Sequence, residues 1–158
     1  MNPGTTDILD DSRITATLPT LTYLLNQGGK VVIVTHLGRP NGQRVDALRL
    51  GPVSERLSTI LKVPVLQIPG WRGSQVKASV EAMPAGSLAV LENIRFDPGE
   101  ETNDPELSRA LASLADVYVN DAFGTAHRAH ASTEGVAHHL PALAGLLMER
   151  ELSVLGDA

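Results

Sequence analysis

The stretch VVIVTHLGRP, residues 31–40, joins a run of apolar, mostly β-branched side chains directly to a loop of polar residues and glycine. An unbroken apolar run of this kind favours a parallel strand that is buried on both faces. We therefore predict a strand over residues 30–35. Ligands of open parallel sheets bind outside the carboxyl ends of the strands. His36, Gly38 and Arg39 then lie at a candidate binding edge, and Gly38 lets the backbone approach a ligand closely.

The composition of the chain restricts its class. The 158 residues fit one domain, and the hydrophobic and charged fractions of 42% and 20% are ordinary for a globular protein. There is no cysteine, which excludes disulfides and thiolate chemistry. The net charge of −5 argues against nucleic acid as a partner. No apolar run approaches the roughly 20 residues of a membrane span, so no membrane partner is expected.

Helix and strand patterns alternate along the rest of the chain. Helical spacing predicts a helix over residues 11–27, and Pro19 predicts a kink or a late start within it. The further predicted strands span residues 63–68, 87–92 and 116–120, and the further predicted helices span residues 52–61, 74–83, 104–114, 132–140 and 142–155. This alternation predicts a parallel sheet with helices on both faces, in a single domain over residues 1–158.

Basic side chains follow three of the predicted strands at their carboxyl ends. The polar residues at these positions are His36 and Arg39, then Asn93 and Arg95, then Asp121, His127, Arg128 and His130. Arg13 joins them if the first helix begins at the same edge of the sheet. Arginine binds phosphate and carboxylate through two parallel hydrogen bonds, and crowded like charges repel unless an anion neutralises them. The pattern predicts a site for a small, multiply charged anion.

Other interpretations of these residues stay open. Any single loop arginine can be a solvated surface residue, and His127 and His130 can cap a helix or bond a backbone carbonyl. The spacing of these histidines also allows metal ligation, but the nearby arginines would repel a cation, so we predict no metal site. The chain contains neither a GxxxxGK[ST] loop nor a GxGxxG fingerprint, so no phosphate-binding loop for a nucleotide is predicted.

Four blocks of the sequence resemble the amino-terminal domain of the phosphoglycerate kinase family. They are DDSRITATLPTLTYLL (10–25), VTHLGRPNG (34–42), the long block from LENIRF to HRAHAST (91–133) and GLLMERELSVLG (145–156). The resemblance covers about residues 8–155. It implies a three-layer α/β/α, Rossmann-like fold and a cytoplasmic enzyme of glycolysis, gluconeogenesis or carbon fixation. That enzyme would reversibly transfer a phosphoryl group between ATP and 3-phosphoglycerate.

The resemblance also implies roles for particular residues. The residues that would bind 3-phosphoglycerate or 1,3-bisphosphoglycerate are Arg13, His36, Gly38, Arg39, Arg95 and Arg128. Arg13 would in addition be catalytic, because it would stabilise the phosphoryl group during transfer. Mg-ATP or Mg-ADP would be a co-substrate bound by a carboxy-terminal domain, so this chain is expected to bind no cofactor. The family is usually monomeric, and pairing of this chain with a nucleotide domain is a further expectation.

The chain departs from the family pattern at both ends. The family begins with a strand that ends in Asp-x-Asn-x-Pro, whereas this chain opens MNPGTTDILDD, in which Asn2 and Pro3 match only part of that motif. We therefore expect the sheet to lack its first strand, and we expect a substrate-binding half that is inactive alone. Two alternatives stay open: a non-catalytic anion-binding or partner-binding module that retains the fold, and an unstable truncation product.

Overall fold

Strand β3 (Leu88–Leu91) is the centre of the fold, because all of its residues are buried. Its side chains alternate between two hydrophobic clusters, as the period of two in a strand requires. Leu88 and Val90 belong to one cluster, whereas Ala89 and Leu91 belong to the other. The unbroken apolar run of this strand therefore reflects burial on both faces of the sheet.

The computed structural model describes residues 12–122 and 128–156. Besides β3, the elements in chain order are α1 (Ser12–Asn26), β1 (Val31–Ile33), η1 (Asp46–Leu48), α2 (Gly51–Leu61), β2 (Val65–Ile68), α3 (Ser74–Glu81), η2 (Ile94–Phe96), α4 (Pro105–Ala112), β4 (Tyr118–Asn120), η4 (Ala131–Gly135), β5 (Ala142–Ala144) and α5 (Leu146–Gly156). The η elements are 3-10 helices, except η4, which is a π-helical turn. The predicted alternation of helices and strands is confirmed.

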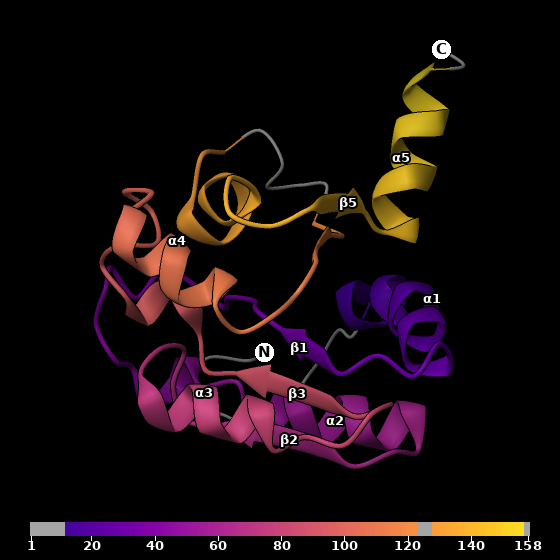
Figure 1. Ribbon diagram of the computed structural model, residues 1–158, viewed down its shortest axis with the longest axis horizontal. Helices are drawn as coiled ribbons and strands as arrows, with labels where there is room; N and C mark the ends of the chain where they lie inside the picture. Colours follow the sequence, from indigo (N-terminus) through magenta and orange to yellow (C-terminus); the bar gives the residue numbers. More distant parts are fainter. Residues whose placement is uncertain (1–11, 123–127, 157–158) are drawn as a thin grey trace.

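All strand pairs in the described residues are parallel, as predicted. Strands β1 and β2 flank β3 in the order β1-β3-β2, with Val31 and Val65 both in register with Leu88. Strands β4 and β5 form a second, two-stranded sheet, in which Tyr118 pairs with Ala142. The single sheet expected from the sequence is therefore divided into two hydrogen-bonded sheets (Figure 1).

Helices cover both faces of the three-stranded sheet, which confirms the three-layer α/β/α arrangement. Leu21 of α1 and Leu57 of α2 pack in the cluster that contains Val90. Val76 of α3 and Leu107 of α4 pack in the opposite cluster. Helix α5 contacts α1 beside the second sheet, as Figure 1 shows on the right of the view. In the parts of the chain that the structure describes, no helix is both long and apolar enough to cross a membrane.

Two of the predicted helices differ from the structure. The helix predicted over residues 142–155 begins only at Leu146, because residues 142–144 form β5 beside β4. In the region of the helix predicted over residues 132–140, the structure has the π-helical turn η4 at its start. A Cβ atom at Gly135 in this turn would overlap the Ser108 hydroxyl of α4, so the close packing of η4 on α4 requires glycine.

The first predicted helix agrees better with the structure. Helix α1 begins at Ser12 and continues through Pro19, so the late start is wrong. The backbone of Gly29 closes the helix by donating a hydrogen bond to the Leu24 carbonyl at 3.1 Å. The expectations about Asn2 and about the first strand of the family concern residues 1–11, which lie outside the described residues.

Candidate anion-binding site

The loop that follows β1 is bound to η2 and its N-cap residue Asn93 by four hydrogen bonds, one of which runs from the Ile94 amide to the Thr35 carbonyl at 3.1 Å. Asn93 Nδ2 donates to the Leu37 carbonyl at 2.8 Å. Arg95 Nη1 donates to the Gly38 carbonyl at 3.1 Å, and the Gly42 amide donates to the Arg95 carbonyl at 3.2 Å. Because β1 and β3 are neighbours, this loop lies at the carboxyl edge where the sequence placed the candidate site.

Asn93 connects several of the segments at this edge. Its side chain is fully buried and accepts a hydrogen bond from the Arg95 amide at 3.1 Å. Besides its bond to Leu37, Nδ2 donates to the Leu48 carbonyl at 2.9 Å. The position of Asn93 after a predicted strand indicated that it lies at the carboxyl edge of the sheet, but its residue type did not indicate a role. Its hydrogen bonds make it a positioning residue for the loop after β1.

Gly38 has a local reason to be glycine. Its φ of +68° lies in the left-handed region that favours glycine. A Cβ atom at this position would also lie 2.8 Å from Leu48 Cδ2. The conformation of the loop therefore requires glycine, whereas close approach of this backbone to a ligand stays a prediction.

Arg95 is buried and incompletely paired. Only 6% of its side chain is exposed, and within the described residues its Nε atom has no hydrogen-bond partner. The Glu101 carboxylate is 3.9 Å from Nε, which makes an ion pair but exceeds hydrogen-bonding distance. Arg95 therefore contributes to the loop through Nη1, while its buried Nε lies beside the Glu101 carboxylate.

The pKa of His36 responds to several of the predicted basic residues. Burial is the largest cause that lowers the pKa of His36 from 6.5 to about 4. The next causes, in order, are the positive charge of Arg95, His130 and the positive charge of Arg13, while Glu101 acts in the opposite direction. The imidazole is therefore neutral at pH 7. These groups come from α1, the β1 loop, η2 and the segment before η4.

The segment after β4 adds two of the predicted residues. His130 has a lowered pKa, first because of burial, and then because of the charge of Arg95; Arg128 contributes in the same direction. His130 Nδ1 lies 3.8 Å from the buried Glu100 carboxylate. Arg128 is exposed. His127 lies outside the described residues.

Two of the predicted arginines are at the solvent surface. Arg13 is exposed at the second residue of α1, and its charge contributes to the lowered pKa of His36. Arg39 is exposed in the β1 loop. Among the described residues, no hydrogen bond or ion pair joins Arg39 to the other predicted site residues. In the two described ranges, no group of three His, Asp or Glu side chains is arranged to hold a metal ion.

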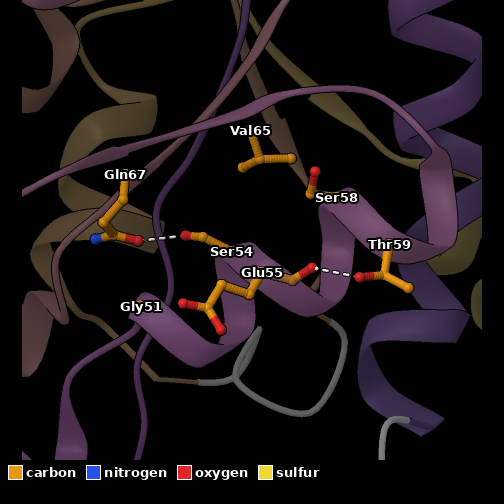
Figure 2. A pocket seen from close by; sticks show the side chains of 7 residues that line it. All are labelled: Gly51, Ser54, Glu55, Ser58, Thr59, Val65 and Gln67. Atoms are coloured by element: carbon orange, nitrogen blue, oxygen red, sulfur yellow. Dashed lines mark hydrogen bonds between the residues drawn. The ribbon is translucent and has the colours of Figure 1, made fainter.

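A separate surface depression lies between α2 and β2 (Figure 2). None of the predicted site residues lines it, and its hydroxyl groups are already paired within the chain. Ser54 Oγ donates to Gln67 Oε1, and Thr59 Oγ1 donates to the Glu55 carbonyl at 3.0 Å. The depression therefore lacks the chemistry of an anion site. Its lining residues are Gly51, Ser54, Glu55, Ser58, Thr59, Val65 and Gln67.

Comparisons with known proteins agree with this fold. The family model "Phosphoglycerate kinase" matches residues 1–158. A phosphoglycerate kinase of Herpetosiphon aurantiacus is 53% identical over 151 residues, which are 96% of this chain and 38% of the relative. The solved phosphoglycerate kinase of Coxiella burnetii aligns with a TM-score of 0.87 at 39% identity, covering 99% of this chain and 38% of that structure. The corresponding structure from Pyrococcus horikoshii OT3 has a TM-score of 0.88 at 36% identity, covering 98% and 39%.

The fold and the site define an α/β protein with basic side chains at the carboxyl ends of its parallel strands. The family match over the whole sequence makes the assignment specific: the chain belongs to the phosphoglycerate kinase family. It spans about 38% of the length of the Herpetosiphon relative.

Proposed function

We propose that this chain is the 3-phosphoglycerate-binding part of a phosphoglycerate kinase, which reversibly transfers a phosphoryl group between ATP and 3-phosphoglycerate. The observation that carries the proposal is the placement of Arg95 against the loop that holds His36, where Arg95 Nη1 donates to the Gly38 carbonyl at 3.1 Å. The charges of Arg13, Arg95 and His130 also lower the pKa of His36. The positive charges of the two arginines disfavour a further charge on His36. An anion with a phosphate and a carboxylate would neutralise them.

Each predicted residue has a role in this proposal. Arg39, Arg95 and Arg128 bind the anionic groups of 3-phosphoglycerate or 1,3-bisphosphoglycerate. Arg95 supports this role because its guanidinium lies against the loop after β1, where Nη1 donates to the Gly38 carbonyl at 3.1 Å. His36 donates one hydrogen bond from its neutral imidazole. Gly38 provides the turn that presents the loop to the ligand.

Arg13 is the proposed catalytic residue. Phosphoryl transfer depends on positioning and on stabilisation of charge, so an arginine contributes to it without acid–base chemistry. The exposure of Arg13 at the start of α1 leaves its guanidinium accessible to a phosphoryl group at the edge of the sheet. Mg-ATP or Mg-ADP is the proposed co-substrate, and none of the residues above is assigned to it. The proposed location of the enzyme is the cytoplasm.

The experiment that tests this function is calorimetric titration of 3-phosphoglycerate into wild type, Arg39→Ala and Arg109→Ala at low and moderate salt. Wild type is expected to bind saturably, and more weakly at the higher salt. Arg39→Ala is expected to lose about tenfold or more in affinity, because a hydrogen bond to a charged group contributes about 1.5–3 kcal/mol.

Arg109→Ala is the matched control. Arg109 is an exposed arginine in the last turn of α4, away from the carboxyl edge of the sheet. Its loss should leave the affinity unchanged. No saturable binding by a wild-type chain that unfolds cooperatively would overturn the proposed function. Equal losses in both variants would show a general charge effect rather than a site.

A further inference from the structure

Glu100 is a buried acid behind the basic cluster, in the loop between η2 and α4. Only 3% of its side chain is exposed. Its carbonyl accepts hydrogen bonds from the Ala131 amide at 3.0 Å and the Asn103 amide at 3.3 Å. The first of these bonds crosses from the η2 loop to the start of η4. The backbone of Glu100 therefore already joins the two segments that carry Arg95 and His130.

The Glu100 carboxylate makes the same connection through its side chain. Oε2 accepts a hydrogen bond from the Ser132 amide at 3.0 Å, and Oε1 accepts one from the Ser132 hydroxyl. Oε1 also lies 3.8 Å from His130 Nδ1. Both oxygens are thus directed at residues 130–132. Burial raises the pKa of Glu100, while the Ser132 bonds and the charge of Arg95 act against that rise.

The segment fixed by Glu100 continues into the candidate site. Thr133 Oγ1 donates to the Arg128 carbonyl at 3.0 Å, and the His130 amide donates to the same carbonyl at 3.1 Å. Arg128 is therefore bonded to a turn that Glu100 anchors at Ser132. Through its bonds to Ala131 and Ser132, Glu100 connects the Arg128–Ser132 segment to the loop that contains Arg95.

We propose that Glu100 is a positioning residue, whose buried carboxylate holds the Arg128–Ser132 segment so that Arg128 and His130 face the anion bound by Arg95. This inference rests on the proposed function of the site. Glu100 does not contact the substrate in this proposal. It acts through Ser132. Its carboxylate therefore strengthens binding of the anion, whereas its negative charge alone would weaken that binding.

A carboxylate that acts through its charge and a carboxylate that positions other groups have opposite effects on the affinity for the anion. A negative charge near an anion site repels the anion, so removal of a carboxylate that acts only through its charge tightens binding. Removal of a carboxylate that positions the binding groups weakens binding. Glu101 is the natural comparison, because its carboxylate lies 3.9 Å from Arg95 Nε, 49% of its side chain is exposed and it makes no hydrogen bond to residues 128–132.

The test is titration of 3-phosphoglycerate into wild type, Glu100→Gln, Glu101→Gln and Ser132→Ala. Glu100→Gln is expected to bind about tenfold more weakly, because the NH2 group that replaces one carboxylate oxygen cannot accept a hydrogen bond from Ser132. Ser132→Ala keeps the charge and loses one hydrogen bond, so it is also expected to bind more weakly. Glu101→Gln is expected to bind up to about threefold more tightly, because it removes only an exposed charge.

A second readout distinguishes positioning from general destabilisation. In folded Glu100→Gln, nuclear magnetic resonance should still show a shift of the Arg95 Nε–H signal when 3-phosphoglycerate is added. The amide signals of residues 128–132 should no longer respond as they do in wild type. Ser132→Ala gives the same comparison with a milder change if Glu100→Gln fails to unfold cooperatively.

The outcomes separate this inference from the function on which it rests. If wild type binds and Glu100→Gln and Ser132→Ala bind as tightly or more tightly, the positioning role is overturned and the function stands. If wild type does not bind, the proposed function is overturned. In that case, hydrogen exchange of the Ala131 and Ser132 amides tests whether the Glu100 side chain holds this segment. Unchanged protection of these amides in Glu100→Gln would overturn the positioning role.

Discussion

At the scale of residues, the loop after β3 depends on polar side chains that are buried rather than exposed. Glu92, Asn93, Arg95 and Asp97 follow β3 and are all buried, although they are charged or polar. Each has a partner within the chain: Glu92, for example, accepts a hydrogen bond from the Leu50 amide at 2.9 Å. Buried polar groups with partners hold a loop in one conformation, since their loss leaves unpaired donors and acceptors.

The first prediction concerns the protonation of His36. In the folded chain without ligand, its titration midpoint should lie near pH 4, against 6.5 for an unperturbed imidazole. Between these values the unfolded chain binds a proton that the folded chain does not, so stability from this group is complete above pH 6.5, declines as the pH falls from 6.5 to about 4 and is fully lost at lower pH. The maximum loss is about 2–3 kcal/mol, with allowance for partial solvent exposure.

The measurement is the titration of the His36 ring signal by nuclear magnetic resonance, together with urea unfolding of wild type and His36→Gln from pH 7 to pH 4. The variant should lose less stability than wild type over this range. Added 3-phosphoglycerate should raise the His36 midpoint, because an anion favours the imidazolium. A midpoint near 6.5 in the ligand-free chain would contradict the arrangement described for the site.

At the scale of elements, the side chain of the residue that follows β4 caps the start of α5. Asp121 follows β4, and its Oδ1 accepts hydrogen bonds from the Leu147 amide at 2.9 Å and the Met148 amide at 3.3 Å. Thr20 Oγ1 of α1 accepts from the Leu146 amide at 2.9 Å. These oxygens satisfy amides in the first turn of the helix, which have no intrahelical partner. The start of α5 is therefore set by residues distant in sequence.

Asp121→Ala should therefore destabilise the chain by about 1 kcal/mol, as expected for loss of a helix cap. Chemical unfolding measures the loss, and hydrogen exchange should increase first at the Leu147 and Met148 amides. Asp116→Ala, which removes an exposed aspartate just before β4, is the control and should change stability by less than about 0.5 kcal/mol. Equal effects in the two variants would rule out the capping role.

At the scale of the whole molecule, the proposed site offers groups for only one of the two substrates. The basic cluster suits a small anion, and the sequence contains no glycine-rich nucleotide motif. The chain spans about 38% of the length of the Herpetosiphon relative. Phosphoryl transfer requires a magnesium nucleotide held in line with its acceptor. The division of labour expected from the sequence thus remains a proposal.

This proposal predicts that the chain binds 3-phosphoglycerate but does not transfer phosphoryl groups alone. With ATP, Mg²⁺ and 3-phosphoglycerate, phosphorus resonance should detect no 1,3-bisphosphoglycerate or ADP above the buffer control. The full-length Herpetosiphon aurantiacus relative should show turnover in the same assay. Turnover by the purified 158-residue chain would contradict the proposed division.

The sequence by itself determined the class of the fold and the edge that carries the site. Alternating apolar periods specify strands and helices locally, and parallel pairing places the carboxyl ends of β1 and β3 together, so the placement of His36 and Arg95 at one edge was predictable. The binding roles of His36, Arg39 and Arg95 stay predictions. The motif blocks added the family. These inferences succeed because they depend on local spacing and on one general property of parallel sheets.

Only the tertiary structure decided which polar residues are buried and what they hold. Glutamate is usually exposed, so the sequence did not distinguish buried Glu100 from its exposed neighbour Glu101. The burial of Glu100 depends on Ser132, which lies 32 positions away. The short strand β5 was likewise missed because its pairing with β4 outweighs a helical pattern. Long-range hydrogen bonds determine these features, and a local sequence pattern does not identify a hydrogen-bond partner that is distant in the sequence.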